Sequence, residues 1–203
     1  MKIVELIIDE EDELGGIDAI SLVSQPAIEE NWIALKDQKE YKLKTLDAEK
    51  RIVLGALLVP NKTIYRKDGK EEYYIYFSKE TVKRASELFL MNGKQNNATL
   101  EHKFDIEGLT LVESWIVENK EKDKSAIYNM DVPVGTWMGA VKVNNDEIWN
   151  EYVKTNKVKG FSIEGYFADK MERPKEKKEE NFSKDEKILK EIVNILTLNN
   201  AKK

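Results

Sequence analysis

Residues 157–167 read KVKGFSIEGYF and alternate between apolar and polar side chains, as residues of a β-strand do. In such a strand Ser162 and Glu164 share the polar face. Gly160 and Gly165 flank the serine, and glycine inside a strand often marks the close approach of another backbone. We therefore predict that this strand lets a peptide approach the Ser162 hydroxyl. The simpler interpretation is a barrel strand with an exposed serine.

Composition and charge exclude several classes of protein. The 203 residues hold 33 Lys and Arg against 38 Asp and Glu, with no basic block, so neither nucleic acid nor an anionic membrane is expected as a partner. The absence of cysteine excludes disulfides, thiolate metal sites and cysteine nucleophiles. With one histidine and no cysteine we expect no metal and no cofactor. No apolar run reaches the length of a membrane span, and the N-terminus turns acidic too early for a signal peptide, so a cytoplasmic location is expected.

Hydrophobic patterning predicts a strand-rich domain. The nearly apolar run 51–60, RIVLGALLVP, is typical of a strand buried on both faces, and Asp68-Gly69 predicts a hairpin. Ser78 is the expected N-cap of a helix through residue 91, and Asn145 or Asp146 that of a short helix further on. Residues 17–32 are read as an extended segment on the core, and 36–50 as a charged surface connection. Further strands are expected at 3–8, 73–77, 99–104, 109–117 and 137–143.

The composition changes sharply after Asp169. Residues 170–183 are rich in Lys, Glu, Arg and Pro and predict a solvated linker. Residues 184–203 carry an apolar stripe at helical spacing and predict an amphipathic helix with a tail. We therefore divide the chain into a domain at 1–169, a linker and a C-terminal helix.

His102, the only histidine, is the side chain best suited to take a proton from a serine and to return it to a leaving amine. Its simpler interpretation is a core histidine beside Leu100 and Phe104. A Ser-His-acid site also needs a group that orients the base. Glu113 lies in the apolar row of the strand 109–117, where a carboxylate needs a partner, and we expect it to take that role.

Other residues compete for these roles. Three adjacent strands would bring Ser162, His102 and Glu113 together. Ser114 is a rival nucleophile that lacks flanking glycines. The competing acids are Glu101, Asp105, Asp131 and Glu164, of which Glu164 shares a face with Ser162.

Five segments, in consistent order, resemble the XkdF-like serine proteases of tailed phages and prophages. This group is related to the prohead proteases and more distantly to the herpesvirus assemblins. The resemblance covers roughly residues 1–168. The segments are 18–31 (DAISLVSQPAIEEN), 101–102 (EH), 112–118 (VESWIVE), 135–143 (GTWMGAVKV) and 159–165 (KGFSIEG).

The resemblance implies an α+β fold, mainly an antiparallel β-barrel surrounded by a few helices. It implies a capsid maturation endopeptidase that cuts phage scaffold, major capsid and other head proteins, and itself, inside the procapsid in the host cytoplasm. The family histidine and serine map to His102 and Ser162, and the acid of phage relatives to Glu113 by our assignment. The assemblin relatives imply a homodimer. The oxyanion hole and the cleavage motif are not assigned.

Two other functions are compatible with the sequence. A non-enzymatic procapsid component would keep the fold and bind scaffold or shell through residues 184–198. A hydrolase using the carboxylates of Glu113 and Glu164 ranks last, because no aromatic-lined cleft for a sugar is evident.

Overall fold

The computed structural model describes residues 2–9, 15–25, 42–69 and 71–170. All of them belong to one structural unit, residues 1–172. The extended segment expected at 17–32 is therefore described only in part. The linker and the C-terminal helix predicted beyond residue 170 lie outside the described residues.

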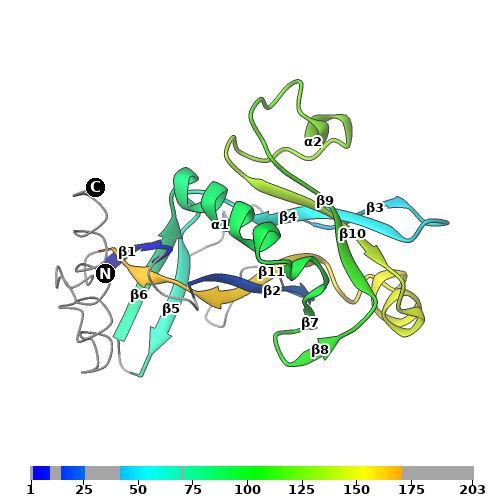
Figure 1. Ribbon diagram of the computed structural model, residues 1–203, viewed down its shortest axis with the longest axis horizontal. Helices are drawn as coiled ribbons and strands as arrows, with labels where there is room; N and C mark the ends of the chain where they lie inside the picture. The colour runs from blue at the N-terminus through cyan, green and yellow to red at the C-terminus, as the bar shows by residue number, and fades with distance from the viewer. Residues whose placement is uncertain (1, 10–14, 26–41, 70, 171–203) are drawn as a thin grey trace, which may run out of the picture. The chain divides into compact units, whose positions relative to one another are not determined.

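Twelve strands and a few short helices make up the described part of the chain (Figure 1). The N-terminal elements are β1 (Lys2–Ile7), β2 (Gly16–Val23), β3 (Lys44–Asp47), β4 (Ile52–Leu58), β5 (Ile64–Asp68), β6 (Glu71–Phe77), α1 (Lys79–Met91) and the 3₁₀ turn η1 (Lys94–Asn96). They are followed by β7 (Ala98–Leu100), β8 (Phe104–Ile106), β9 (Leu109–Ile116), α2 (Lys124–Ile127), β10 (Trp137–Val143), the π-helix η2 (Ile148–Val153), β11 (Gly160–Tyr166) and β12 (Ala168–Asp169).

The strands pair into three four-stranded sheets with the orders β12-β1-β6-β5, β3-β4-β10-β9 and β11-β2-β7-β8. Pairing is antiparallel except for β1 with β6 and β2 with β7. The α+β class with mainly antiparallel strands is thus confirmed. None of the three sheets closes into a ring through the pairings of the described strands, so the barrel stays a prediction.

The core lies where these sheets meet. β4 is paired on both sides, by β3 and β10, and is almost wholly buried, as its apolar sequence predicted. Gly55 on β4 leaves room for Phe161 on β11, since a Cβ at Gly55 would lie 2.8 Å from that ring. This close packing holds the strand that carries Ser162 against the central sheet. Helix α1 begins after Ser78, whose Oγ accepts the Thr81 N–H, and contributes Phe89 to an edge-to-face contact with Trp137.

Several short elements were missed and one strand was predicted wrongly. β3 lies in the charged segment that we read as a surface connection, and α2, η1 and β12 were not expected. Residues 99–104 do not form one strand: β7 ends at Leu100, and β8 begins at Phe104 as its antiparallel neighbour. The backbone reverses here because Glu101 and His102 have φ values of 53° and 56°, in the left-handed region. His102 therefore lies in a tight turn, and the alternation expected there does not apply.

Candidate functional site

Ser162 lies near the middle of β11, an edge strand of its sheet, and is partly exposed. The predicted alternation is confirmed, because Phe161 is buried in the core, and Ile163 and Phe167 pack against that core. The opposite face carries Ser162 and Glu164. β11 pairs with β2 so that Ser162 lies opposite Ser21.

The β7–β8 turn holds His102 beside this strand. The backbone N–H of His102 donates to Ser21 Oγ at 3.0 Å. Glu101 anchors the turn twice, because its N–H donates to the carbonyl of Leu22 at 2.9 Å and its Oε1 accepts the N–H of Ser24 at 2.7 Å. These bonds hold two consecutive left-handed residues that would otherwise be disfavoured.

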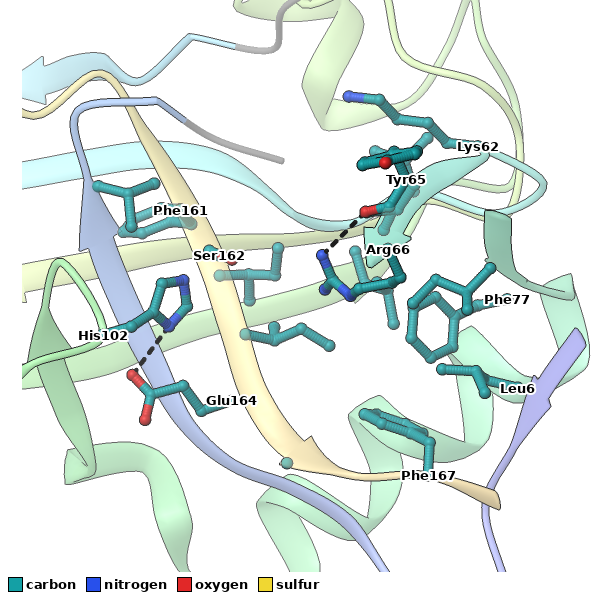
Figure 2. A pocket seen from close by; sticks show the side chains of 18 of the residues that line it. Leu6, Lys62, Tyr65, Arg66, Phe77, His102, Phe161, Ser162, Glu164 and Phe167 are labelled. Atoms are coloured by element: carbon teal, nitrogen blue, oxygen red, sulfur yellow. Dashed lines mark hydrogen bonds and ion pairs between the residues drawn. The ribbon is translucent and has the colours of Figure 1, made fainter. Parts of the chain in front are cut away.

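Glu164 is the carboxylate that contacts His102. Its Oε1 lies 3.0 Å from His102 Nδ1, and the same oxygen accepts a hydrogen bond from Thr99 Oγ1. Figure 2 shows Nδ1 directed at Glu164, with the other edge of the ring on the side where Ser162 lies. A carboxylate at Nδ1 favours the tautomer with its proton there, which leaves the Nε2 lone pair able to accept a proton. The side chains of His102 and Glu164 are 35% and 33% exposed, so substrate and water can reach the pair.

The structure does not bring Glu113 to His102. Glu113 lies on β9 opposite Ala140, with its side chain 46% exposed in an ion pair with Lys124. The predicted need for a partner is met, but by a lysine at the surface. The pairing of β9 with β10 shifts at Val112, which leaves both Val112 and Glu113 exposed. A bulge of this kind interrupts the strict alternation that placed Glu113 in an apolar row.

Two of the remaining candidates contact residues outside the pair. Ser114 Oγ accepts the indole N–H of Trp137 at 2.8 Å, and Asp131 pairs with Lys120 at 3.3 Å. Asp105 is exposed on β8. Glu113 and Glu164 belong to different sheets, so the structure does not form a pair of these two carboxylates.

Gly165 serves a different purpose from the one we expected. A Cβ on it would lie 2.1 Å from the carbonyl oxygen of Gly16 and 2.8 Å from Cα of Ile17, both on β2. The pairing shifts at this point, since Glu164 lies opposite Ala19 and Gly165 opposite Ile17. The close backbone at Gly165 is thus β2 of the same chain.

A groove of about 1340 Å³ opens in front of the pair. It runs between β11 and the edge strand β5, and its walls include Ser162, His102 and Glu164. Its volume exceeds the roughly 300–1,000 Å³ typical of small-molecule sites. Figure 2 shows Leu6, Phe77 and Phe167 together at one end of the groove, with Arg66 between them and Ser162.

Charges around the groove are mostly positive. Among the described residues, Lys62, Arg66, Lys67 and Lys103 line it, and Lys67 pairs with Glu72. The carboxylates among those lining residues, Glu101 and Glu164, accept hydrogen bonds within the site. Tyr65 also lines the groove. Burial, together with a hydrogen bond to Glu72, raises the pKa of the Tyr65 hydroxyl, so this hydroxyl stays protonated near neutral pH.

Within the described ranges no group of three or more His, Asp or Glu side chains is arranged to hold a metal ion. No helix in those ranges is long and apolar enough to cross a membrane.

Sequence reasoning did not identify Ser21 and Thr99 as site residues. Both are hydroxyl residues in strands, and no local motif distinguishes them. Glu164 was among the competing acids, and the signal that favoured it was its position two residues from Ser162 on the same face. Glu101 was a competitor too, and it anchors the turn.

A family model described as "Putative phage serine protease XkdF" matches residues 40–172. The match includes His102, Ser162 and Glu164, whereas β1 and β2 lie before it. No curated protein and no solved structure matches the chain. Because the model covers more than half of the sequence, the chain belongs to this family of phage serine proteases.

Proposed function

From this family membership we propose that the chain is an active serine endopeptidase with Ser162 as nucleophile, His102 as general base and Glu164 as the orienting acid. The observation that carries the proposal is the 3.0 Å contact between Nδ1 of the only histidine and Oε1 of Glu164, on the same strand face as Ser162. These three residues line the groove, and the groove supports a peptide as the substrate.

The mechanism follows from the roles of the three side chains. Ser162 Oγ attacks the carbonyl carbon of the scissile peptide bond, and its proton passes to His102 Nε2. When the tetrahedral intermediate collapses, the C–N bond breaks and His102 returns the proton to the leaving amine. Water then attacks the acyl-enzyme with His102 again as base, and Ser162 is released. The Glu164 carboxylate stabilises the imidazolium form of His102.

The substrates in this proposal are the scaffold, major capsid and other head proteins of the phage, with cleavage inside the procapsid in the bacterial cytoplasm. The chain itself is a further substrate, and a homodimer is the proposed assembly. The barrel architecture belongs to the same proposal. These points rest on the resemblance set out under "Sequence analysis".

The test is mass spectrometry of head proteins after co-expression of this chain with the shell and scaffold proteins encoded beside it. Wild type should produce discrete truncations, and Ser162→Ala should leave every protein intact. Ser114→Ala is the matched control, because it removes the rival hydroxyl on β9 and should cleave as wild type does. Intact masses with wild type would favour a non-enzymatic procapsid component, and loss of cleavage only in Ser114→Ala would assign the nucleophile to β9.

A further inference from the structure

Three hydroxyl residues form a row across three neighbouring strands. Ser162 on β11 lies opposite Ser21 on β2, and Ser21 lies opposite Thr99 on β7. Residues in register on adjacent strands present their side chains to the same face of a sheet. The row therefore passes beneath His102 and Glu164, which lie on that face.

Ser21 and Thr99, the other two members of the row, are buried and do not line the groove. Ser21 is 0% exposed and Thr99 is 5% exposed, and neither is a wall residue of the groove. Each makes a hydrogen bond to the site. Ser21 Oγ accepts the backbone N–H of His102, and Thr99 Oγ1 donates to Glu164 Oε1. A buried hydroxyl bonded in this way holds its partner from the side opposite to the substrate.

The hydrogen bond from Thr99 restricts Glu164 at Oε1, the oxygen that also contacts His102. Oε1 accepts from both Thr99 Oγ1 and His102 Nδ1, so the two donors converge on one oxygen. A glutamate side chain that is one-third exposed can adopt several rotamers, and a change of rotamer would break its contact with the ring of His102. The fixed hydroxyl of Thr99 selects the rotamer in which Oε1 faces Nδ1.

We propose that Thr99 is a positioning residue that orients Glu164 and thereby sets the tautomer of His102. This inference builds on the proposed function. With Glu164 held, the neutral ring keeps its proton on Nδ1 and presents the Nε2 lone pair to Ser162. Without the Thr99 hydroxyl, Glu164 leaves Nδ1 for part of the time, and the ring also populates the tautomer with its proton on Nε2, which cannot accept a proton from Ser162.

The single histidine makes the test direct, because the imidazole ¹⁵N spectrum of the full-length chain reports on His102 alone. Wild type, Thr99→Val and Thr99→Ser are recorded above the pH at which the ring becomes neutral. The Nδ1–H form should dominate in wild type and in Thr99→Ser, which restores the donor. Thr99→Val should show a clear gain of the Nε2–H form.

The second readout is the rate at which a fluorophosphonate labels Ser162. Thr99→Val should label roughly 10- to 150-fold more slowly, the effect of losing one hydrogen bond to a charged group, and Thr99→Ser should recover most of the rate. Thr136→Val is the matched control, because Thr136 is fully buried and donates to the carbonyl of Pro133, away from the groove. It should change neither the tautomer nor the rate.

The two proposals fail in different ways. An unchanged tautomer in Thr99→Val overturns the role of Thr99, whatever the labelling rate. A shifted tautomer in Thr99→Val, in a chain whose wild type does not react with the fluorophosphonate, supports the positioning role and removes the proposed activity. Equal tautomer shifts in Thr99→Val and Thr99→Ser would also overturn the inference, because packing rather than the hydroxyl would then be the cause.

Discussion

The Nδ1 atom of His102 lies 3.0 Å from Oε1 of Glu164, although the two residues are 62 positions apart in the chain. Glu164 follows Ser162 by two residues on one strand, so a single element carries both the candidate nucleophile and the acid. The base comes from the β7–β8 turn of the same sheet. One sheet therefore supplies all three groups, and the relative placement of the groups depends on the pairing of β11 with β2 and of β2 with β7.

Replacing each carboxylate by its amide should show whether Glu164 or Glu113 orients His102. In Glu164→Gln the amide NH₂ can donate to Nδ1 and favour the wrong tautomer, so fluorophosphonate labelling of Ser162 should slow by about 10³- to 10⁴-fold. Glu113→Gln is the matched control, because Glu113 is half-exposed and pairs with Lys124 at the surface. It should label within about twofold of wild type, as loss of a surface ion pair costs little. The reverse ranking would return the acid role to Glu113.

The turn that carries His102 should depend on the side chain of Glu101. Glu101→Ala leaves the Ser24 N–H without its acceptor and removes one of the bonds that hold two left-handed residues, so labelling of Ser162 should slow several-fold. Unfolding in urea should show a loss of about 1–2 kcal/mol. Glu101→Gln keeps an oxygen acceptor and should recover most of both quantities. If Glu101→Ala labels at the wild-type rate, the turn does not need this anchor.

A methyl group at Gly165 should destabilise the protein more than one at Gly93. The Cβ of Gly165→Ala would meet the Gly16 carbonyl at 2.1 Å, so β11 and β2 must separate, with an expected loss of about 3 kcal/mol. The Cβ of Gly93→Ala would have no atom within 4 Å, so the expected loss of stability is only the backbone strain at φ +69°, about 1 kcal/mol. Urea denaturation of both variants checks the difference. Equal losses would mean that the two strands do not approach as closely as described.

Asp123 should stabilise the protein in a pH-dependent way. Burial raises the pKa of its carboxyl, but the N–H and O–H of Ser125 and the indole N–H of Trp115 lower the pKa more, so the net shift is downward from 3.8. Because the pKa is lower in the folded chain, the stabilisation is complete above the unfolded pKa and is lost as the pH falls through the folded pKa.

The measurement for Asp123 compares wild type with Asp123→Asn by urea unfolding at pH 7 and at pH 3. At pH 7 the variant should be about 1–2 kcal/mol less stable, because hydrogen bonds to a neutral oxygen are weaker than those to a charged one. At pH 3 the gap should narrow. A gap of the same size at both pH values would show that the charge on Asp123 does not contribute.

Local patterns predicted the elements that local physics controls. The alternation in 157–167 predicted β11 and placed Ser162 and Glu164 on one face, because side chains alternate along any strand. Ser78 predicted the start of α1 because a hydroxyl at that position caps free N–H groups. The apolar run at 51–60 predicted the central buried strand β4, since only a strand covered on both faces can bury so many apolar residues.

Tertiary structure alone decided which acid meets His102. The choice between Glu113 and Glu164 depends on the strand pairing that places β9 in another sheet, where a bulge exposes Glu113, and on a left-handed turn at Glu101 and His102 that is maintained by contacts with distant residues. A β-bulge moves a side chain to the other face without any change in the local pattern, and positive φ at two non-glycine residues is stable only where other strands supply the compensating hydrogen bonds. The sequence by itself therefore identified the serine and the histidine as candidates, whereas strand pairing between distant segments determined how the two are held.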